Sequence, residues 1–390
     1  MDKHILWLAS WYPNALTPYD GDFIQRHARA VALFQKITVI HIKKDEEGKM
    51  TTDVQSFSSS QNNLEEIIVF YKPIKTRLHY LNRLLSAIKY KKIYRHILRN
   101  YINENGKPDL VHVQVALNAG IQALWLKKNF HIPFIVSEHW TGYLPGVKFG
   151  LKDLSILSKK AMQKIFFEAG KITVVSDVLG KAISNQVISK GYIIIPNAVD
   201  TSIFFPEYFP VNSTLQFIHI SSLAYQKNCS AIINAFKLLK SNGYDFQLLI
   251  YGPDKPGLKQ LVKENELENC IAFKNEVPQS QLASELRTAD ALILYSRYET
   301  FGCVVIEANA CGVPAILSNL PVFKEYIVEN ENGLFVTPDN PAALAEKVAD
   351  YILGKYQFDK KSISRKTVEK FSYTIIGKQF YDLYKTLILI

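Results

Sequence analysis

Short apolar segments rich in Val and Ile alternate with longer segments of helical periodicity along the whole sequence, and this alternation constrains the fold most. Because the apolar segments are continuous, they fit strands that are covered on both faces. Strands that alternate with helices indicate parallel sheets, so the sequence predicts an α/β fold of doubly wound sheets. The expected strands are 4–11, 37–42, 67–71, 110–115, 134–138, 172–176, 192–196, 215–221, 246–251, 271–274, 291–296, 315–318 and 334–336. The expected helices lie near 22–35, 78–103, 118–129, 152–169, 177–189, 229–241, 256–265, 279–288, 302–310, 341–353 and 373–388, and the polar stretch 51–63 is expected to be a loop.

The length of 390 residues exceeds what one hydrophobic core usually holds, so two Rossmann-like domains in tandem are expected. We predict domains at 1–200 and 201–372, because the stretch 196–214 contains Pro206 and Pro210 and has no clear periodicity. Four cysteines without a C-x-x-C pair argue against a disulfide framework or a cysteine zinc site and favour a reducing cytoplasm. Apolar runs stay shorter than the roughly 18 residues of a membrane span, so an integral membrane protein is not expected.

The positive charge is concentrated in the first half of the chain. Residues 1–200 carry 27 basic and 16 acidic groups, and the stretch 72–107 alone holds ten Lys or Arg and one acid, Glu104. Apolar residues recur there at spacings of three and four, which predicts an amphipathic helix with a basic polar face. Two interpretations stay open: a solvated surface helix, or a helix that contacts anionic lipid head groups. Nucleic-acid binding is not predicted, because the basic stretch comes without a recognisable binding module.

The sharpest motif extends from Glu299 to Pro314. It begins where the strand 291–296 ends, and a helix is expected to open near Phe301 or Gly302. Free backbone amides at a helix start bind a diphosphate, and a glycine there permits close approach. Glu299 precedes this helix and Glu307 lies inside it, so the two carboxylates could meet hydroxyls on either side of a sugar nucleotide. The alternative is structural: a capping or salt-bridged Glu307 and a surface Glu299. Dinucleotide and ATP motifs of the G-x-G-x-x-G and Walker types are missing from the sequence.

With its E-x7-E spacing, this motif resembles the signature of retaining GT-B glycosyltransferases of glycosyltransferase family 4. Further similar segments are Ser10-Trp-Tyr-Pro-Asn with the Gly21 loop, Ser137-Glu-His139, Ile195-Pro-Asn-Ala-Val-Asp200 and Ser221-Ser-Leu-Ala-Tyr-Gln-Lys227. The resemblance covers most of the chain and implies two Rossmann-like domains that face each other across a cleft. The N-terminal domain would take the acceptor and the C-terminal domain the nucleotide sugar. The resemblance also implies that the last helix, 373–390, packs back on the N-terminal domain.

The same resemblance assigns roles to individual residues. Glu307 would bind the nucleotide ribose, Glu299 the donor sugar, and Lys227 the leaving diphosphate. Further donor contacts would come from the amides of Thr300, Phe301 and Gly302, from the Gly21 loop, and from His139 over the donor sugar. This chain departs from the family pattern at Ser222, where the family commonly has an arginine. Arg297 or Arg26 would then have to compensate the second phosphate charge.

The predicted function is transfer of a sugar, with retention of configuration, from a UDP- or GDP-linked donor to a glycan or lipid-linked acceptor. The setting implied is bacterial surface polysaccharide assembly, such as capsule, O-antigen or exopolysaccharide. Neither a cofactor nor a metal is expected, since Asp20-Gly-Asp22 is better explained as a helix N-cap than as a cation site. The expected location is the cytoplasm, with helix 76–103 at the inner membrane face. Two alternatives remain: a nucleotide-sugar epimerase of the same architecture, and a non-catalytic scaffold that binds glycan or membrane.

Overall fold

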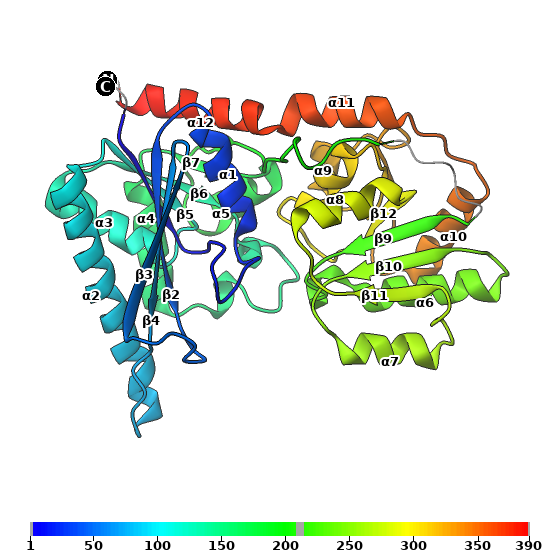
Figure 1. Cartoon of the computed structure of the whole chain (residues 1–390), viewed down its shortest axis with the longest axis horizontal. Coiled ribbons are helices and arrows are strands. Elements are labelled where there is room, and N and C mark those ends of the chain that lie inside the picture. Colours follow the sequence, from blue (N-terminus) through cyan, green and yellow to red (C-terminus); the bar gives the residue numbers. More distant parts are fainter. Residues whose placement is uncertain (1–2, 208–213, 389–390) are drawn as a thin grey trace. The chain divides into compact units, whose positions relative to one another are not determined.

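The computed structural model describes residues 3–207 and 214–388 (Figure 1). The chain divides into two compact units, each of which is described by itself. The first comprises Met1–Tyr143, Phe149–Ala198 and Tyr373–Ile390, and the second comprises Leu144–Lys148 and Val199–Ser372. Each unit is a Rossmann-like α/β domain, as the alternation of strands and helices predicts. Among the described residues, no helix combines the length and the apolar character that a bilayer crossing requires.

The first unit is built on an eight-stranded sheet with the order β3-β4-β2-β1-β5-β6-β7-β8. The central strand β1 pairs in parallel with both β2 and β5, and every residue of β1 is buried. Burial on both faces explains why these strands read as continuous apolar runs. The strands are β1 (Ile5–Ala9), β2 (Ile37–Lys44), β3 (Val54–Gln61), β4 (Leu64–Tyr71), β5 (Leu110–Gln114), β6 (Phe134–Glu138), β7 (Ile172–Val174) and β8 (Ile193–Ile194).

The expectation of a loop over 51–63 is wrong. Residues Val54–Gln61 form β3, which pairs antiparallel with β4 at the edge of the sheet. Most of its side chains are exposed, and four of its eight residues are serines, so no buried face marks the strand in the sequence. Instead, the antiparallel ladder of backbone hydrogen bonds to β4 stabilises the strand. A strand of this kind is invisible to hydrophobic periodicity.

Helices cover both faces of this sheet. They are α1 (Asp22–Ala32), α2 (His79–Asn105), α3 (Ala119–Phe130), α4 (Ile156–Glu168), α5 (Asp177–Gln186) and α12 (Tyr373–Ile388). The last helix, α12, runs alongside α1, which begins 351 residues earlier in the chain (Figure 1). The contact is close because Gly377 of α12 lies against the backbone of α1, where a Cβ would stand 2.0 Å from the carbonyl oxygen of Ala30.

The basic helix α2 has the predicted position, but its apolar residues do two different things. In its second half Tyr94, Leu98 and Tyr101 are buried against the sheet. In its first half Leu84 and Ile88 are 58% and 44% exposed. The buried stripe therefore depends on tyrosines, which the count of aliphatic spacings leaves out, and part of the expected apolar face is open to solvent.

The second unit has a parallel six-stranded sheet with the order β11-β10-β9-β12-β13-β14. Its strands are β9 (Gln216–Ile220), β10 (Gln247–Tyr251), β11 (Ile271–Lys274), β12 (Ala291–Leu294), β13 (Ala315–Ser318) and β14 (Gly333–Val336). Its helices are α6 (Cys229–Ser241), α7 (Pro256–Glu264), α8 (Gln279–Thr288), α9 (Cys303–Ala310), α10 (Pro341–Ile352) and α11 (Lys360–Phe371). The order of the strands reverses between β9 and β12, and ligands of open parallel sheets bind at the carboxyl ends of strands at such a reversal.

Candidate functional site

The loop that joins β12 to α9 shapes the candidate site of the second unit. Gly302 stands at the N-cap of α9 with φ +89°, a conformation that favours glycine. A Cβ on Gly302 would also approach the ring of Phe323 to 2.9 Å. The preceding turn is fixed because the Tyr326 hydroxyl donates to the Phe301 carbonyl at 2.5 Å and the two rings stack. Among the described residues, no side chain caps this helix start.

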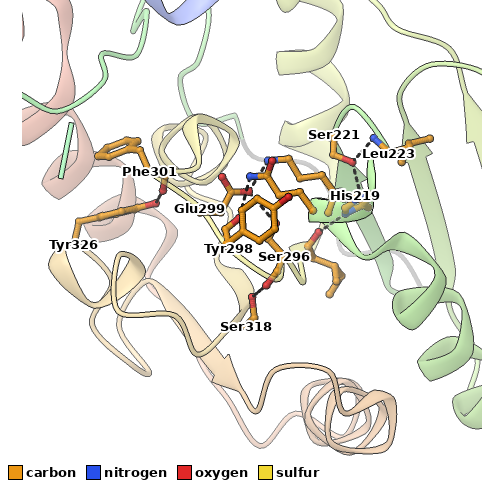
Figure 2. A network of polar contacts seen from close by, with 12 residues as sticks. His219, Ser221, Leu223, Ser296, Tyr298, Glu299, Phe301, Ser318 and Tyr326 are labelled. Atoms are coloured by element: carbon orange, nitrogen blue, oxygen red, sulfur yellow. Dashed lines mark hydrogen bonds and ion pairs between the residues drawn. The ribbon is translucent and has the colours of Figure 1, made fainter. Parts of the chain in front are cut away.

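Glu299 and Lys227 meet directly in front of this helix start. The Lys227 ammonium lies 2.5 Å from Oε1 of Glu299, although the two residues are 72 positions apart. They come together because Lys227 follows β9, Glu299 follows β12, and β9 and β12 are neighbours in the sheet. Ser296 donates a second hydrogen bond to the same oxygen at 2.8 Å, and Ser318 holds the Ser296 carbonyl at 2.6 Å (Figure 2).

The pair is largely removed from solvent, which strengthens its electrostatics. The side chain of Glu299 is 5% exposed and that of Lys227 is 18% exposed. Both of the contacts to the Glu299 carboxylate end on Oε1, and within the described residues Oε2 accepts no hydrogen bond. A carboxylate oxygen with free lone pairs at the edge of a helix start is suited to accept hydrogen bonds from ligand hydroxyls.

The other predicted donor residues differ in their surroundings. Glu307 lies on the second turn of α9 and is only 3% exposed. The side chain of Phe301 is buried against Tyr326, so the Phe301 side chain serves packing. Thr300 is half-buried, and Ser222 is exposed in the loop that follows β9.

Arg297 is engaged by protein groups. Its Nε lies 3.2 Å from Oδ1 of Asp339, one of its terminal nitrogens donates to the Tyr225 carbonyl at 2.6 Å, and the guanidinium lies over the Tyr225 ring. Arg26, the other residue proposed to replace the missing arginine, belongs to the first unit and pairs with Asp22 at 2.6 Å. Each guanidinium therefore already has a carboxylate partner.

Two residues at this edge of the sheet were not predicted. His219 of β9 is fully buried; its Nδ1 bonds the Ile293 carbonyl and its Nε2 bonds Ser221, both at 2.8 Å (Figure 2). Burial lowers the pKa of His219 to about 4, so the ring is neutral. Ser221 in turn accepts from the Leu223 amide, which fixes the loop leading to Lys227. A polar residue in an apolar strand was the available signal.

In the first unit His139 follows β6. Its Nε2 lies 3.3 Å from the Gln114 side-chain oxygen, its Nδ1 has no partner among the described residues, and burial holds its pKa well below the usual range. The adjacent Glu138 is fully buried and accepts from the amides of His139, Trp140 and Ala116 and from the Tyr143 hydroxyl. Burial raises the pKa of Glu138 in spite of these bonds. Glu138 therefore connects the loop after β6, which contains His139, to the loop after β5, which contains Ala116.

Gly21 caps α1 with φ +72°. A Cβ on Gly21 would lie 2.7 Å from the backbone of Trp11, so the fold itself requires glycine here. The neighbouring acids have cationic partners: Asp20 contacts Lys43 at 2.8 Å and Asp22 contacts Arg26. Over the described part of the chain, no cluster of three or more His, Cys, Asp or Glu side chains is arranged to hold a metal ion.

Known proteins resemble this chain over most of its length. A family model for glycosyl transferases group 1 matches residues 200–372, and one for glycosyltransferase family 4 matches residues 50–203. An uncharacterised glycosyltransferase of Methanocaldococcus jannaschii is 25% identical over 76% of this chain and 78% of its own length. A putative teichuronic acid biosynthesis glycosyltransferase of Bacillus subtilis, TuaC, is 23% identical over 89% and 88%. The crystal structure of Anabaena HepE with UDP and glucose superposes with a TM-score of 0.72 over 98% of this chain and 100% of HepE, at 16% identity.

Proposed function

Because this chain belongs to glycosyltransferase family 4 and has the GT-B fold of two Rossmann-like domains, we propose that it transfers a sugar from a nucleoside diphosphate donor with retention of configuration. The observation that carries the proposal is the buried Lys227–Glu299 pair in front of the glycine-capped start of α9. It puts a cation, the start of a helix and a carboxylate oxygen at one strand-reversal point. The presence of UDP and glucose in the HepE structure supports a UDP-sugar as the first donor to test.

The charges at this point suit the departure of a nucleoside diphosphate. Breaking the anomeric C–O bond develops negative charge on the diphosphate and positive charge on the sugar, so stabilisation of the leaving group supplies much of the catalysis. Lys227 and the first amides of α9 would stabilise the diphosphate, while Oε2 of Glu299 accepts from the sugar hydroxyls and Glu307 from the ribose. The acceptor hydroxyl attacks from the face that the diphosphate leaves and gives its proton to a diphosphate oxygen. This route uses neither a protein nucleophile nor a metal ion.

Replacing Glu299 by glutamine tests the proposal. The amide keeps the size of the side chain but loses its charge, so we expect release of UDP from UDP-glucose or a related donor to fall by about 10²- to 10³-fold. Binding of UDP, followed by the rise in melting temperature that it causes, should change much less. The exposed Glu276 of the same unit provides the matched control, and Glu276→Gln should keep full turnover.

The products separate this proposal from its alternatives. A retaining transferase yields a glycoside with the anomeric configuration of the donor, which NMR of the product reads directly. An isomerised sugar nucleotide formed without any acceptor would point to an epimerase. Full activity of Glu299→Gln, or a trapped glycosyl-enzyme on a side chain, would refute the proposed mechanism.

We further propose that the protein works at an anionic membrane surface in the assembly of a surface polysaccharide, as the likeness to TuaC supports. Helix α2 exposes Leu84 and Ile88 one to two turns before the exposed Lys91 and Lys92, a combination that suits the interface of an anionic bilayer. Lys89 is less suitable, because its ammonium pairs with Asp53 at 2.5 Å.

Neutralising Lys91 and Lys92 tests this membrane role. Each lysine near an anionic surface contributes about 1 kcal/mol, so Lys91→Gln with Lys92→Gln should reduce the partition coefficient onto phosphatidylglycerol vesicles roughly tenfold or more. Sedimentation with these vesicles measures the effect. The control is Lys237→Gln with Lys240→Gln, two exposed lysines of α6. Equal sedimentation of both double variants would rule out α2 as the contact.

A further inference from the structure

A cavity of about 920 Å³ opens at the carboxyl edge of the first unit's sheet. Its lining comes from the ends of β2 and β4, from Ser10 after β1, from Asn118 after β5, and from the first half of α2. The strand order of this sheet reverses between β1 and β5, so the cavity lies at the reversal point where ligands of such sheets bind. Its volume is in the range of sites for small molecules.

The charge of the lining is positive. Lys43, Lys44 and Lys75 line the cavity, and Glu46 is the only acid among its described lining residues. Lys44 pairs with Glu46 at 2.5 Å, but the two side chains are 38% and 65% exposed, and exposed ion pairs contribute little. Among the described residues, the one hydrogen bond of the Lys75 ammonium goes to the Glu46 backbone carbonyl, at 3.4 Å. An anion that enters the cavity can therefore pair with the ammonium groups of Lys44 and Lys75 while only weak contacts of these lysines are lost. Lys43 is paired with Asp20 and is less available.

Two further features of the cavity point to a ligand. His41 is 1% exposed and lines the cavity; its Nδ1 lies 2.9 Å from the Ala9 carbonyl and therefore carries the proton, which leaves a lone pair on Nε2. That Nε2 has no hydrogen-bond partner among the described residues, so it can accept from a ligand hydroxyl. The loop that presents Asn118 is strained, with φ of +66° at Asn118 and +67° at the β-branched Val115.

The strained loop is held by named contacts. Ser10 donates to the carbonyls of Val115 and Leu117, and Glu138 accepts from the Ala116 amide. Strain that the surrounding structure maintains in this way is typical of functional loops. Here it sets Asn118, with an amide that can donate and accept, at the edge of a basic cavity.

We propose that this cavity binds the acceptor and that the acceptor carries an anionic group, a phosphate or a carboxylate, which Lys44 and Lys75 neutralise. The inference rests on the proposed function, since it assigns the acceptor of the same reaction. His41 and Asn118 would receive hydroxyls of the acceptor sugar. The rings of Tyr71 and Tyr90, which also line the cavity, offer apolar surface for the sugar faces.

Binding of three small sugars to the full-length protein, with UDP present at saturation, tests the inference by calorimetry. Glucose 1-phosphate carries a phosphate, methyl glucuronide carries a carboxylate, and methyl glucoside is neutral. At least one of the two anionic sugars should bind ten times more tightly than methyl glucoside, and the advantage should shrink as salt is raised. The anionic sugar that binds more tightly identifies phosphate or carboxylate as the recognised group.

Variants tie the preference to the cavity. Lys44→Gln with Lys75→Gln should remove the advantage of the anionic sugar and leave methyl glucoside unchanged. If the double variant is unstable, Lys75→Gln alone serves instead, because among the described residues it breaks a single contact to a backbone carbonyl. It should reduce the binding advantage of the anionic sugar several-fold. The control is Lys36→Gln with Lys171→Gln, two exposed lysines of the same unit outside the cavity.

The outcomes separate this inference from the proposed function. Equal binding of all three sugars, or an anion preference that survives loss of Lys44 and Lys75, overturns the inference. If Glu299-dependent release of UDP persists in that case, the transferase proposal stands without it. A protein that prefers anionic sugars but neither binds UDP nor cleaves UDP-sugars would refute the transferase proposal instead.

Discussion

Glu299, Lys227 and Gly302 lie near the start of α9, and the proposed reaction gives each a different physical task. The carboxylate and the ammonium neutralise each other, and this neutrality makes their burial tolerable. Gly302 allows the chain to turn into α9 without a side chain between Phe323 and the helix start. In the proposed reaction, the start of α9 and the charged pair would face the same ligand.

A methyl group on Gly302 should lower the free energy of unfolding. In Gly302→Ala the new Cβ would meet the ring of Phe323 at 2.9 Å and would be strained at φ +89°, so we expect a loss of about 1–3 kcal/mol in the free energy of unfolding. Urea denaturation followed by circular dichroism measures this loss. Gly257 lies in α7 with no atom within 4 Å of its would-be Cβ, so Gly257→Ala should be neutral or stabilise by about 0.5–1 kcal/mol. Equal effects of the two changes would contradict this account.

At the scale of elements, the sequence predicts the buried strands and helices. It misses elements that have little apolar surface of their own and are stabilised by contacts with neighbouring elements. The central strands and α9 follow from apolar runs, glycine and the Glu299 motif. The edge strand β3 has no apolar face, and α11 was not predicted because its sequence is rich in lysine and contributes only a few buried residues, such as Ile363 and Phe371. Its clearest signal is Asp359, which accepts from the amides of Lys361 and Ser362 at the helix start.

The candidate site shows the same limit. The E-x7-E motif predicts Glu299 and Glu307 because both lie in one segment. The contact between Glu299 and Lys227 depends on β9 and β12 being neighbours, whereas β10 and β11 lie between them in the sequence. The basic cavity likewise joins residues from β2, β4, α2 and two loops, so periodicity along one segment cannot reveal it.

The packing of α12 on α1 is one of the contacts that hold α12 in the first unit, beside the hydrogen bonds of Tyr384 to Trp7 and His112. In Gly377→Ala the Cβ would stand 2.0 Å from the Ala30 carbonyl oxygen, so the two helices must separate and we expect a loss of roughly 2 kcal/mol or more. Urea unfolding followed by tryptophan fluorescence measures the first unit. Gly191→Ala is the control, since nothing lies within 4 Å of its would-be Cβ. An unchanged midpoint for Gly377→Ala would mean that this contact is not close in solution.

For the molecule as a whole, the two units differ in how many buried histidines they contain. In the first unit burial lowers the pKa of His27 and His41 to about 4 and that of His112 and His139 well below the usual range. The second unit contains a single histidine, His219, with a pKa of about 4. These imidazoles are protonated in the unfolded chain below pH 6.5 but stay neutral in the folded protein, so acid favours unfolding. Glu138 opposes the trend, because its raised pKa stabilises the folded first unit as the pH falls.

Acidification should therefore weaken the first unit more than the second. Between pH 7.5 and 5.5 each histidine with a folded pKa near 4 costs about 1.4 kcal/mol. His27 and His41 together cost the first unit about 3 kcal/mol, to which His112 and His139 add, whereas His219 costs the second unit about 1.4 kcal/mol. All four tryptophans belong to the first unit, so their fluorescence reports its melting, while circular dichroism reports both units.

We expect the fluorescence midpoint to fall by several degrees more than the later circular dichroism transition over this pH range, because the lost free energy is larger in the first unit. His96→Gln, which removes an exposed imidazole, should leave the difference unchanged. Carboxylates with ordinary pKa values near 4 contribute little above pH 5.5, and the raised pKa of Glu138 makes the loss in the first unit smaller. Equal shifts of both midpoints would show that the two units unfold together or that the buried histidines of the first unit reach solvent without unfolding.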